Sequence, residues 1–248
     1  MGPYKVIALD MDGTVLNSSH AISPENRKWI DKAIEAGITV MFSTGRGVQS
    51  VQKYVEELNL QSPMVSVNGS EVWKAPGVLF KRHLMETEWI KWLHGIAATH
   101  GTWFWGYAVE GLFNKDHWTD NLDDKQWLKF GFMTDDAEKL ALIRGVLEER
   151  ELFEITNSNV NNLEINPRGI SKASGIMDVC NLLGVKMEEV MAMGDSLNDL
   201  TMIKESGLGI AMGNAQEELK LAANAVTATN NEDGVALAIR KYAFGLEE

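Results

Sequence analysis

The chain has 248 residues, of which 45% are apolar and 23% are charged, and these values argue against a largely disordered protein. Its 35 acidic and 23 basic side chains give a formal net charge of -12, which argues against a nucleic-acid backbone or an anionic membrane as the main partner. A small anionic substrate stays compatible with this charge, because a bound cation can reverse the local field.

Cysteine content and apolar runs indicate the compartment. Cys180 is the single cysteine, so no intrachain disulfide can form. No apolar run approaches the roughly 20 residues of a membrane span, and the run before Asp10 is too short for a signal peptide. We therefore expect a cytoplasmic protein with neither nucleic acid nor membrane as partner, and the oligomeric state stays open.

The first third of the chain alternates between strand and helix patterns. Short apolar runs are typical of buried strands, and Ser-Pro before an amphipathic segment is typical of a helix start. The expected elements are a strand at residues 6–9 that ends at Asp10, a helix from Ser23-Pro24 to Gly37, a strand at 38–42, a helix at about 48–58 and a strand at 63–67. Such alternation predicts parallel pairing with right-handed crossovers.

Residues 83–167 differ from the segments on either side and hold six of the eight tryptophans. We expect most of these tryptophans to build an apolar core, although Trp103 and Trp105 share one strand face and could stack on a sugar. The expected elements are helices at about 86–100 and 135–150 and strands at about 102–109, 126–133, 152–158 and 161–166. This mixture predicts an α+β insert.

After the insert the α/β alternation resumes. The expected elements are a helix at about 171–183 that ends at Gly184, a strand at 190–193, short strands at 208–212 and 225–227, and a last helix from about Gly234. The predicted fold class is therefore α/β, with a Rossmann-like parallel-sheet core formed by residues 1–82 and 168–248 and a smaller inserted α+β domain at 83–167.

Polar clusters follow three of the predicted parallel strands. They are Asp10-Met11-Asp12-Gly13-Thr14, Ser43-Thr44-Gly45-Arg46 and Gly194-Asp195-Ser196-Leu197-Asn198-Asp199. Lys172 lies at the start of a predicted helix. Ligands of open parallel sheets bind outside the carboxyl ends of the strands, so we expect these distant segments to converge on one crevice.

The residue types in these clusters are suited to phosphoryl transfer. One carboxylate of the Asp10 and Asp12 pair can act as nucleophile while the other exchanges a proton with the leaving group and then with water. Asp195 adds a third carboxylate, and carboxylates packed together favour a cation with hard oxygen ligands, such as Mg²⁺. Lys172 and the Thr44-Gly45 pair can hold phosphate oxygens. The pattern predicts transfer through an aspartyl-phosphate.

The four motifs, in this order, resemble those of the haloacid dehalogenase-like superfamily. Asp10-Met11-Asp12-Gly13-Thr14 resembles its first motif, Thr44 its second, Lys172 its third and Gly194 to Asp199 its fourth. The insert lies between the second and third motifs, as in the Cof-like subgroup, whose members carry a large α/β cap. The resemblance therefore implies that residues 83–167 form a mobile cap over the crevice.

The resemblance also implies individual roles. Asp10 would be the nucleophile and a Mg²⁺ ligand, and Asp195 a second carboxylate ligand. Asp12 would be the general acid/base, with its backbone carbonyl on the metal. Asp at position 12 favours phosphatase or phosphomutase chemistry over dehalogenation in this superfamily.

For the phosphate, the resemblance implies that Thr44-Gly45 and Lys172 hold its oxygens. Asn198 would reach the phosphate or Lys172, and Asp199 would orient Lys172 or a metal-bound water. For Arg46, a substrate contact and a structural salt bridge remain equal alternatives.

We therefore expect a Mg²⁺-dependent phosphatase acting on small phosphorylated metabolites, sugar phosphates among them. A phosphomutase or phosphotransferase of the same superfamily is the first alternative. A phospho-accepting signalling module also uses clustered acids and a lysine, but it has no reason for an 85-residue insert at 83–167.

Overall fold

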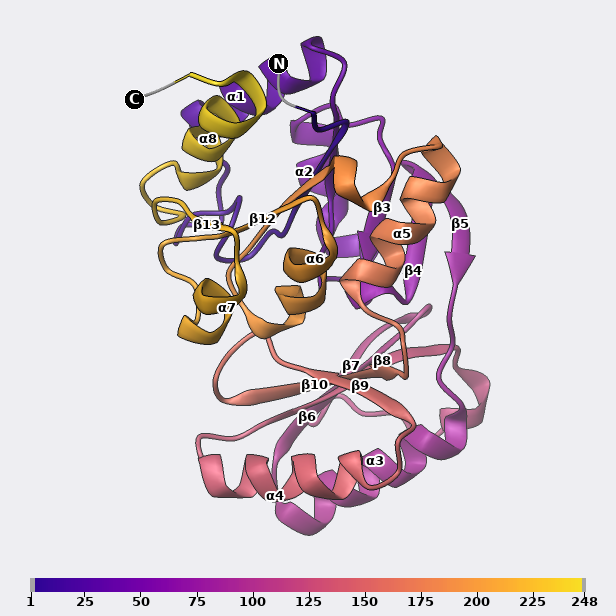
Figure 1. The fold of residues 1–248 in the computed structure, drawn as a ribbon. Coiled ribbons are helices and arrows are strands. Elements are labelled where there is room, and N and C mark those ends of the chain that lie inside the picture. The colour runs from indigo at the N-terminus through magenta and orange to yellow at the C-terminus, as the bar shows by residue number, and fades with distance from the viewer. Residues whose placement is uncertain (1–2, 247–248) are drawn as a thin grey trace.

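The computed structural model describes residues 3–246, so the first two and last two residues of the predicted core lie outside it. Figure 1 shows a sheet flanked by helices and, beyond it, a second sheet whose far side is covered by α3 (Thr87–His100) and α4 (Ala137–Glu148). Among residues 3–246, no helix combines the length and apolar character that crossing a membrane requires.

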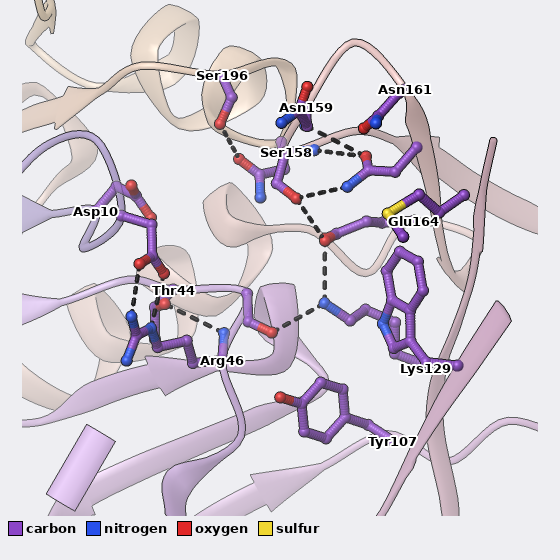
Figure 2. Close-up of a pocket in the computed structure, with 16 residues that line it drawn as sticks. Asp10, Thr44, Arg46, Tyr107, Lys129, Ser158, Asn159, Asn161, Glu164 and Ser196 are labelled. Carbon is purple, nitrogen blue, oxygen red and sulfur yellow. Dashed lines mark hydrogen bonds and ion pairs between the residues drawn. The ribbon is translucent and has the colours of Figure 1, made fainter. Parts of the chain in front are cut away.

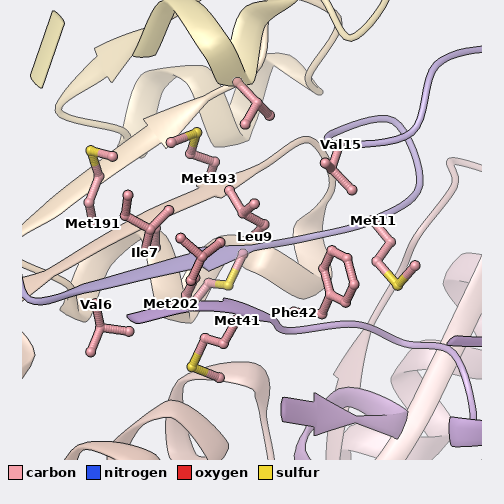
Figure 3. Close-up of a cluster of buried hydrophobic side chains, with 14 of the residues drawn as sticks. Val6, Ile7, Leu9, Met11, Val15, Met41, Phe42, Met191, Met193 and Met202 are labelled. Carbon is pink, nitrogen blue, oxygen red and sulfur yellow. The ribbon is translucent and has the colours of Figure 1, made fainter. Parts of the chain in front are cut away.

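The first sheet is parallel throughout and has the strand order β13-β12-β11-β1-β2. Its strands are β1 (Val6–Leu9), β2 (Thr39–Phe42), β11 (Val190–Gly194), β12 (Leu208–Ala211) and β13 (Ala225–Val226). All four side chains of β1 are fully buried, as expected for a strand covered on both faces (Figure 3). The chain moves from β1 to β2 on one side and from β11 to β13 on the other, which makes β1 the switch point of the topology.

Local signals set the bounds of the helices around this sheet. The helices are α1 (Pro24–Glu35), α2 (Val48–Glu57), α5 (Lys172–Leu183), α6 (Leu200–Glu205), α7 (Glu217–Ala222) and α8 (Gly234–Ala238). Ser23 caps α1 by accepting a hydrogen bond from the amide of Asn26, and Ser171 caps α5 by accepting one from the amide of Ser174. Gly184 ends α5 in the left-handed conformation, with φ of 66°. The predicted starts of both helices and the end of α5 are thus confirmed.

The strand predicted at 63–67 has a different partner from the one expected. β3 (Met64–Ser66) contacts the parallel sheet through a single bridge between Ser43 and Val65, and its ladder is antiparallel, with β4 (Glu71–Ala75). β4 pairs in turn with β5 (Val78–Arg82), a hairpin that the sequence patterns did not predict. Val67 and Asn68 both have positive φ, which turns the chain back on itself and lets β4 return along β3.

The insert forms an antiparallel sheet with the order β7-β6-β8-β10-β9. Its strands are β6 (Trp103–Ala108), β7 (Gly111–Asn114), β8 (Trp127–Met133), β9 (Phe153–Thr156) and β10 (Asn162–Pro167). Its buried apolar side chains form a cluster of their own, separate from the cluster around the parallel sheet. The α/β fold class with an antiparallel α+β insert is therefore confirmed.

The two faces of the insert sheet differ in chemistry. Phe104, Phe130 and Phe132 are buried in the cluster under α3 and α4. Trp103 and Trp105 lie on the opposite face of β6 and are only half-buried, so the shared face predicted for them is confirmed. The other four insert tryptophans pack in or against the apolar cluster, as expected for most of them: Trp89, Trp92, Trp118 and Trp127.

We propose that the two apolar clusters correspond to two cooperative units, a core of residues 1–82 and 168–248 and a cap of residues 83–167. On this proposal Phe132→Ala, at a fully buried position, removes about 3–5 kcal/mol from the free energy of unfolding of the cap, because a cavity replaces the ring. Hydrogen exchange followed by mass spectrometry should then show faster exchange in β6 and β8, with little change in β1.

The matched control is Phe42→Ala, which makes a similar cavity at a buried site beside β1 and should speed exchange in the parallel sheet instead. If both variants speed exchange equally in both sheets, the two-unit division is wrong.

Candidate active site

Loops that follow β1, β2 and β11 meet the insert sheet around a cavity of about 360 Å³ (Figure 2). Six of the nine predicted site residues line it, namely Asp10, Asp12, Thr44, Gly45, Arg46 and Asn198. The insert contributes the opposite wall with Trp105, Tyr107, Lys129, Met133, Ser158, Asn159, Asn161, Asn162 and Glu164. The cavity therefore lies at the carboxyl ends of the parallel strands, at the switch point next to β1.

Lys172 is the first residue of α5 and is completely buried behind the cavity. Its Nζ lies 2.6 Å from Asp10 Oδ1 and 2.6 Å from Asp199 Oδ1. Burial disfavours the charged ammonium, but the two carboxylates outweigh burial and hold the pKa of Lys172 above its ordinary value. The structure thus places the lysine predicted at the helix start directly against the predicted nucleophile.

Three carboxylates gather at this point. Oxygens of Asp10, Asp195 and Asp199 lie within 4.8 Å of one another. Burial, together with the neighbouring carboxylates, raises the pKa of Asp10 to about 7 and that of Asp195 to about 9. Such proximity is costly without a cation between the charges. The cluster has the hard oxygen donors that a divalent cation requires.

The three acids are not equivalent. Oδ1 of Asp199 accepts from Lys172, and its Oδ2 accepts from the backbone amides of Asp195 at 2.9 Å and Ser196 at 3.1 Å. Both oxygens of Asp199 are therefore occupied within the protein, whereas among residues 3–246 the carboxylate of Asp195 accepts only a long contact of 3.4 Å from Ser196 Oγ. Asp10 and Asp195 are accordingly the side chains best placed to bind a cation.

The loop after β1 passes very close to Asp195. A Cβ atom on Gly13 would lie 2.3 Å from Asp195 Oδ2, and Gly13 has φ of 75°, which side chains disfavour. Only glycine fits here, so the Asp10-Met11-Asp12-Gly13 sequence holds the loop of Asp10 against the loop of Asp195.

Asp12 and Arg46 form a two-pronged ion pair beside the cavity. Arg46 Nε donates to Asp12 Oδ2 at 2.7 Å and Nη2 donates to Asp12 Oδ1 at 2.5 Å. The Asp12 side chain is half exposed, so it can reach solvent, unlike the buried Asp10. Of the two alternatives for Arg46, the structure contains the salt bridge, and the guanidinium also borders the cavity.

Thr44 and Asn198 border the same space. Thr44 Oγ1 accepts a hydrogen bond from the Arg46 amide at 3.1 Å, which leaves the hydroxyl proton free to donate. Asn198 accepts from Ser196 Oγ and donates to Asn68 Oδ1 at 3.4 Å, and Lys172 is contacted by Asp199 instead. Asn198 thus lines the cavity, and in the described part of the chain its side chain bonds to Ser196 and Asn68 and makes no hydrogen bond to Lys172.

Sequence reasoning missed a buried polar network that joins the insert to the core. Lys129 of β8 donates to the Gly45 carbonyl oxygen at 2.9 Å and to Glu164 Oε2 of β10 at 3.1 Å. Glu164 Oε2 also accepts from Asn68 Nδ2 at 2.5 Å, and Figure 2 shows the Lys129 amine between Glu164 and the loop that carries Thr44 and Arg46. The available signal was one charged residue among apolar neighbours in each strand, Lys129 between Leu128 and Phe130 and Glu164 between Leu163 and Ile165.

The charges in this network compensate each other. Burial lowers the pKa of Lys129, and Glu164 partly opposes that effect. Burial alone would raise the pKa of Glu164, but Lys129 and the hydrogen bonds from Asn68 and Ser158 keep it below its usual value. Both groups are therefore held charged only because they are paired.

Comparison with known proteins gives consistent matches over nearly the whole chain. A family model described as haloacid dehalogenase-like hydrolase matches residues 7–239. The 5-amino-6-(5-phospho-D-ribitylamino)uracil phosphatase YcsE of Bacillus subtilis is 44% identical, over 96% of this chain and 95% of that protein. YitU of the same organism, which has the same enzyme name, is 30% identical over 97% of both chains.

A solved structure gives the same result. A haloacid dehalogenase-like hydrolase from B. subtilis has a TM-score of 0.89 to this structure at 25% identity, and the match covers 95% of this chain and 99% of that one.

We predict that Glu164→Gln lowers the free energy of unfolding by about 3–5 kcal/mol, because it leaves the Lys129 ammonium buried without a counter-charge. Urea denaturation measures the change. Lys129→Met combined with Glu164→Gln removes both charges and should lose less stability than Glu164→Gln alone. A double variant that is less stable than the single variant would show that charge compensation is not the source of the effect.

Proposed function

This chain belongs to the haloacid dehalogenase-like hydrolases and is a phosphatase, and from this premise we propose that it hydrolyses small phosphate monoesters through an aspartyl-phosphate on Asp10 with Mg²⁺ as cofactor. The observation that carries the proposal is the position of Asp10, which lines the cavity while Lys172 and Asp195 lie directly behind it.

The first half-reaction forms a bond between a carboxylate oxygen of Asp10 and phosphorus as the bond to the leaving alcohol breaks. Asp12, half exposed, first leaves its ion pair with Arg46 and takes a proton from solvent, and it then gives that proton to the leaving oxygen. Donors at Thr44, Gly45 and Lys172 stabilise the phosphoryl oxygens as charge develops on them.

The second half-reaction reverses the role of Asp12. Its carboxylate now removes a proton from water, the water oxygen attacks phosphorus, and the bond to Asp10 breaks. Inorganic phosphate leaves and Asp10 returns to its starting state. The buried Lys172 opposes the effect of burial on the pKa of Asp10 and so favours the ionised nucleophile, and a bound cation would lower that pKa further, since a protonated carboxyl group is a poor nucleophile.

The donor set fits Mg²⁺. Asp10 and Asp195 supply carboxylate oxygens with elevated pKa values, which a bound divalent cation would lower, and the backbone carbonyl of Asp12 completes the proposed ligands. When bound, Mg²⁺ neutralises charge on the carboxylates and the phosphate oxygens.

For the substrate, we propose 5-amino-6-(5-phospho-D-ribitylamino)uracil as the first compound to test, because two relatives at 44% and 30% identity are named for its hydrolysis. The cavity, at about 360 Å³, is of a size for a small metabolite. A cytoplasmic location remains a prediction from the sequence.

The test is steady-state release of inorganic phosphate from this compound with Mg²⁺. Many turnovers per protein molecule support a phosphatase, whereas a single stoichiometric phosphorylation would indicate a signalling module. Transfer of the phosphoryl group to a second sugar, without free phosphate, would indicate a phosphomutase.

Asp10→Asn should reduce turnover by at least about a thousandfold while the fold is retained, since a neutral amide cannot form the acyl-phosphate. The measurement is kcat with saturating substrate, and circular dichroism checks the fold. Asp31→Asn, on the exposed side of α1, is the matched control and should keep full activity. Substantial turnover by folded Asp10→Asn protein would reject Asp10 as the nucleophile.

Mg²⁺ binding should depend on pH. With pKa values of about 7 and about 9, Asp10 and Asp195 carry protons in the metal-free protein that a cation must displace. Since both folded-state pKa values are raised, the metal-free fold loses stability as pH rises from about 4 through these values, and Mg²⁺ offsets that loss. We expect the Mg²⁺-induced rise in Tm to be larger at pH 8.5 than at pH 6.

Thermal denaturation in EDTA and in Mg²⁺ measures this difference. Apparent Mg²⁺ affinity should rise about tenfold per pH unit for each proton displaced. Asp195→Asn, which removes one ligand, should abolish most of the Mg²⁺ effect at both pH values. An equal Tm shift at pH 6 and 8.5 in the unaltered protein would contradict the proposed proton displacement.

A further inference from the structure

We propose that Trp105 is the platform on which a flat ring in the leaving group stacks, so that this phosphatase selects phosphate esters whose alcohol portion carries a planar heterocycle. The inference rests on the proposed function of the cavity. It adds the feature of the substrate that is recognised and the side chain that recognises it.

The indole of Trp105 lies flat against the backbone of β8. Trp105 pairs across the strands with Gly131, and a Cβ atom added to Gly131 would lie 2.3, 2.4 and 2.6 Å from three atoms of the indole. Three ring atoms at nearly equal short distances mean that one face of the ring covers the glycine. Any side chain at position 131 would push the ring away, so glycine at this position is what allows the indole to lie against β8.

Trp105 also borders the cavity, so the ring is accessible from that space away from the face that covers Gly131. Trp105 is only half-buried, and it is the one tryptophan among residues 3–246 that lines the cavity with Asp10. Its neighbour Trp103 lies on the same side of β6, with ring centroids 5.8 Å apart, but does not line the cavity. A flat indole with one face supported and the other open is the geometry that stacking requires.

The rest of this wall suits a heterocycle better than a sugar alone. Tyr107 and Met133 border the cavity beside Trp105. Asn159 and Asn161 bring carboxamides to the same space, and Figure 2 shows both across the cavity from Tyr107. A carboxamide offers a donor next to an acceptor, which complements the edge of a cyclic amide. With the phosphate at Asp10, a short polyol chain would carry such a ring to this wall.

The competing explanation is that Trp105 only covers the glycine and stabilises the sheet. Tryptophan over glycine in an antiparallel pair is sufficient for that purpose. The two explanations differ in one measurable respect, since a purely structural tryptophan does not distinguish esters that share a phosphate and polyol but differ in the ring.

The experiment uses a matched pair of substrates, 5-amino-6-(5-phospho-D-ribitylamino)uracil and D-ribitol 5-phosphate, which lacks the ring. Trp105→Leu should raise KM for the ring-bearing ester about tenfold or more, with kcat nearly unchanged, and should leave KM for ribitol phosphate unaltered. Trp105→Phe, which keeps an aromatic ring, should have a KM for the ring-bearing ester close to that of the unaltered protein. Trp103→Leu, at the neighbouring position outside the cavity, should change neither substrate.

Gly131→Ala provides an independent variant that displaces the indole without replacing any side chain that lines the cavity, and it should reproduce the effect of Trp105→Leu. Circular dichroism and Tm establish that each variant is folded. An unchanged preference for the ring in folded Trp105→Leu protein overturns the proposal. An equal loss on both substrates overturns it as well, because it would show general distortion of the cavity.

Calorimetric binding of both esters to Asp10→Asn protein separates this inference from the proposed function. If the unaltered protein hydrolyses neither ester, the proposed substrate class fails, and the binding arm still tests the platform. The proposal is supported if Asp10→Asn protein binds the ring-bearing ester more tightly than ribitol phosphate and if the double variant with Trp105→Leu loses this difference. Equal binding of both esters by the Asp10→Asn single variant overturns the proposal.

Discussion

The buried ammonium of Lys172 is the interaction on which the arrangement of the site depends. Asp10, Asp195 and Asp199 crowd into one small volume, and Lys172 supplies the positive charge that contacts two of them. Ser171 caps the start of α5 and so fixes the position of Lys172. Lys172 lies only five residues after Pro167, the last residue of β10. The return of the chain from the insert thus determines where the buried positive charge lies.

The parallel sheet and the acidic site were predictable because their signals are local. Apolar runs identify β1 and β11, and the polar residues directly after them must lie at the same sheet edge. The β4–β5 hairpin was not predictable in this way, because three consecutive residues of β5, Val78 to Phe80, are exposed and show no alternation. The return of β4 along β3, which precedes that hairpin, also depends on positive φ at Val67 and Asn68, a conformation that residues other than glycine seldom adopt.

The Lys129–Glu164 pair escaped prediction for a different reason. Its members are 35 residues apart and meet only when β8 and β10 pair, so neither local pattern contains the partner. The same holds for Asn68, which is 96 residues from Glu164 in the chain. Individual site residues could be named from the sequence, but the contacts that hold the two halves of the cavity together required the three-dimensional structure.

The contact of Lys129 with the Gly45 carbonyl has a consequence for exchanging caps between related enzymes. The peptide between Gly45 and Arg46 carries that carbonyl on one side and, on the other, the amide that bonds to Thr44 Oγ1. A transplanted cap that lacks a cation at this point would leave the loop of Thr44, Gly45 and Arg46 without the hydrogen bond from Lys129. A donor cap therefore has to match the recipient core at these few buried polar groups.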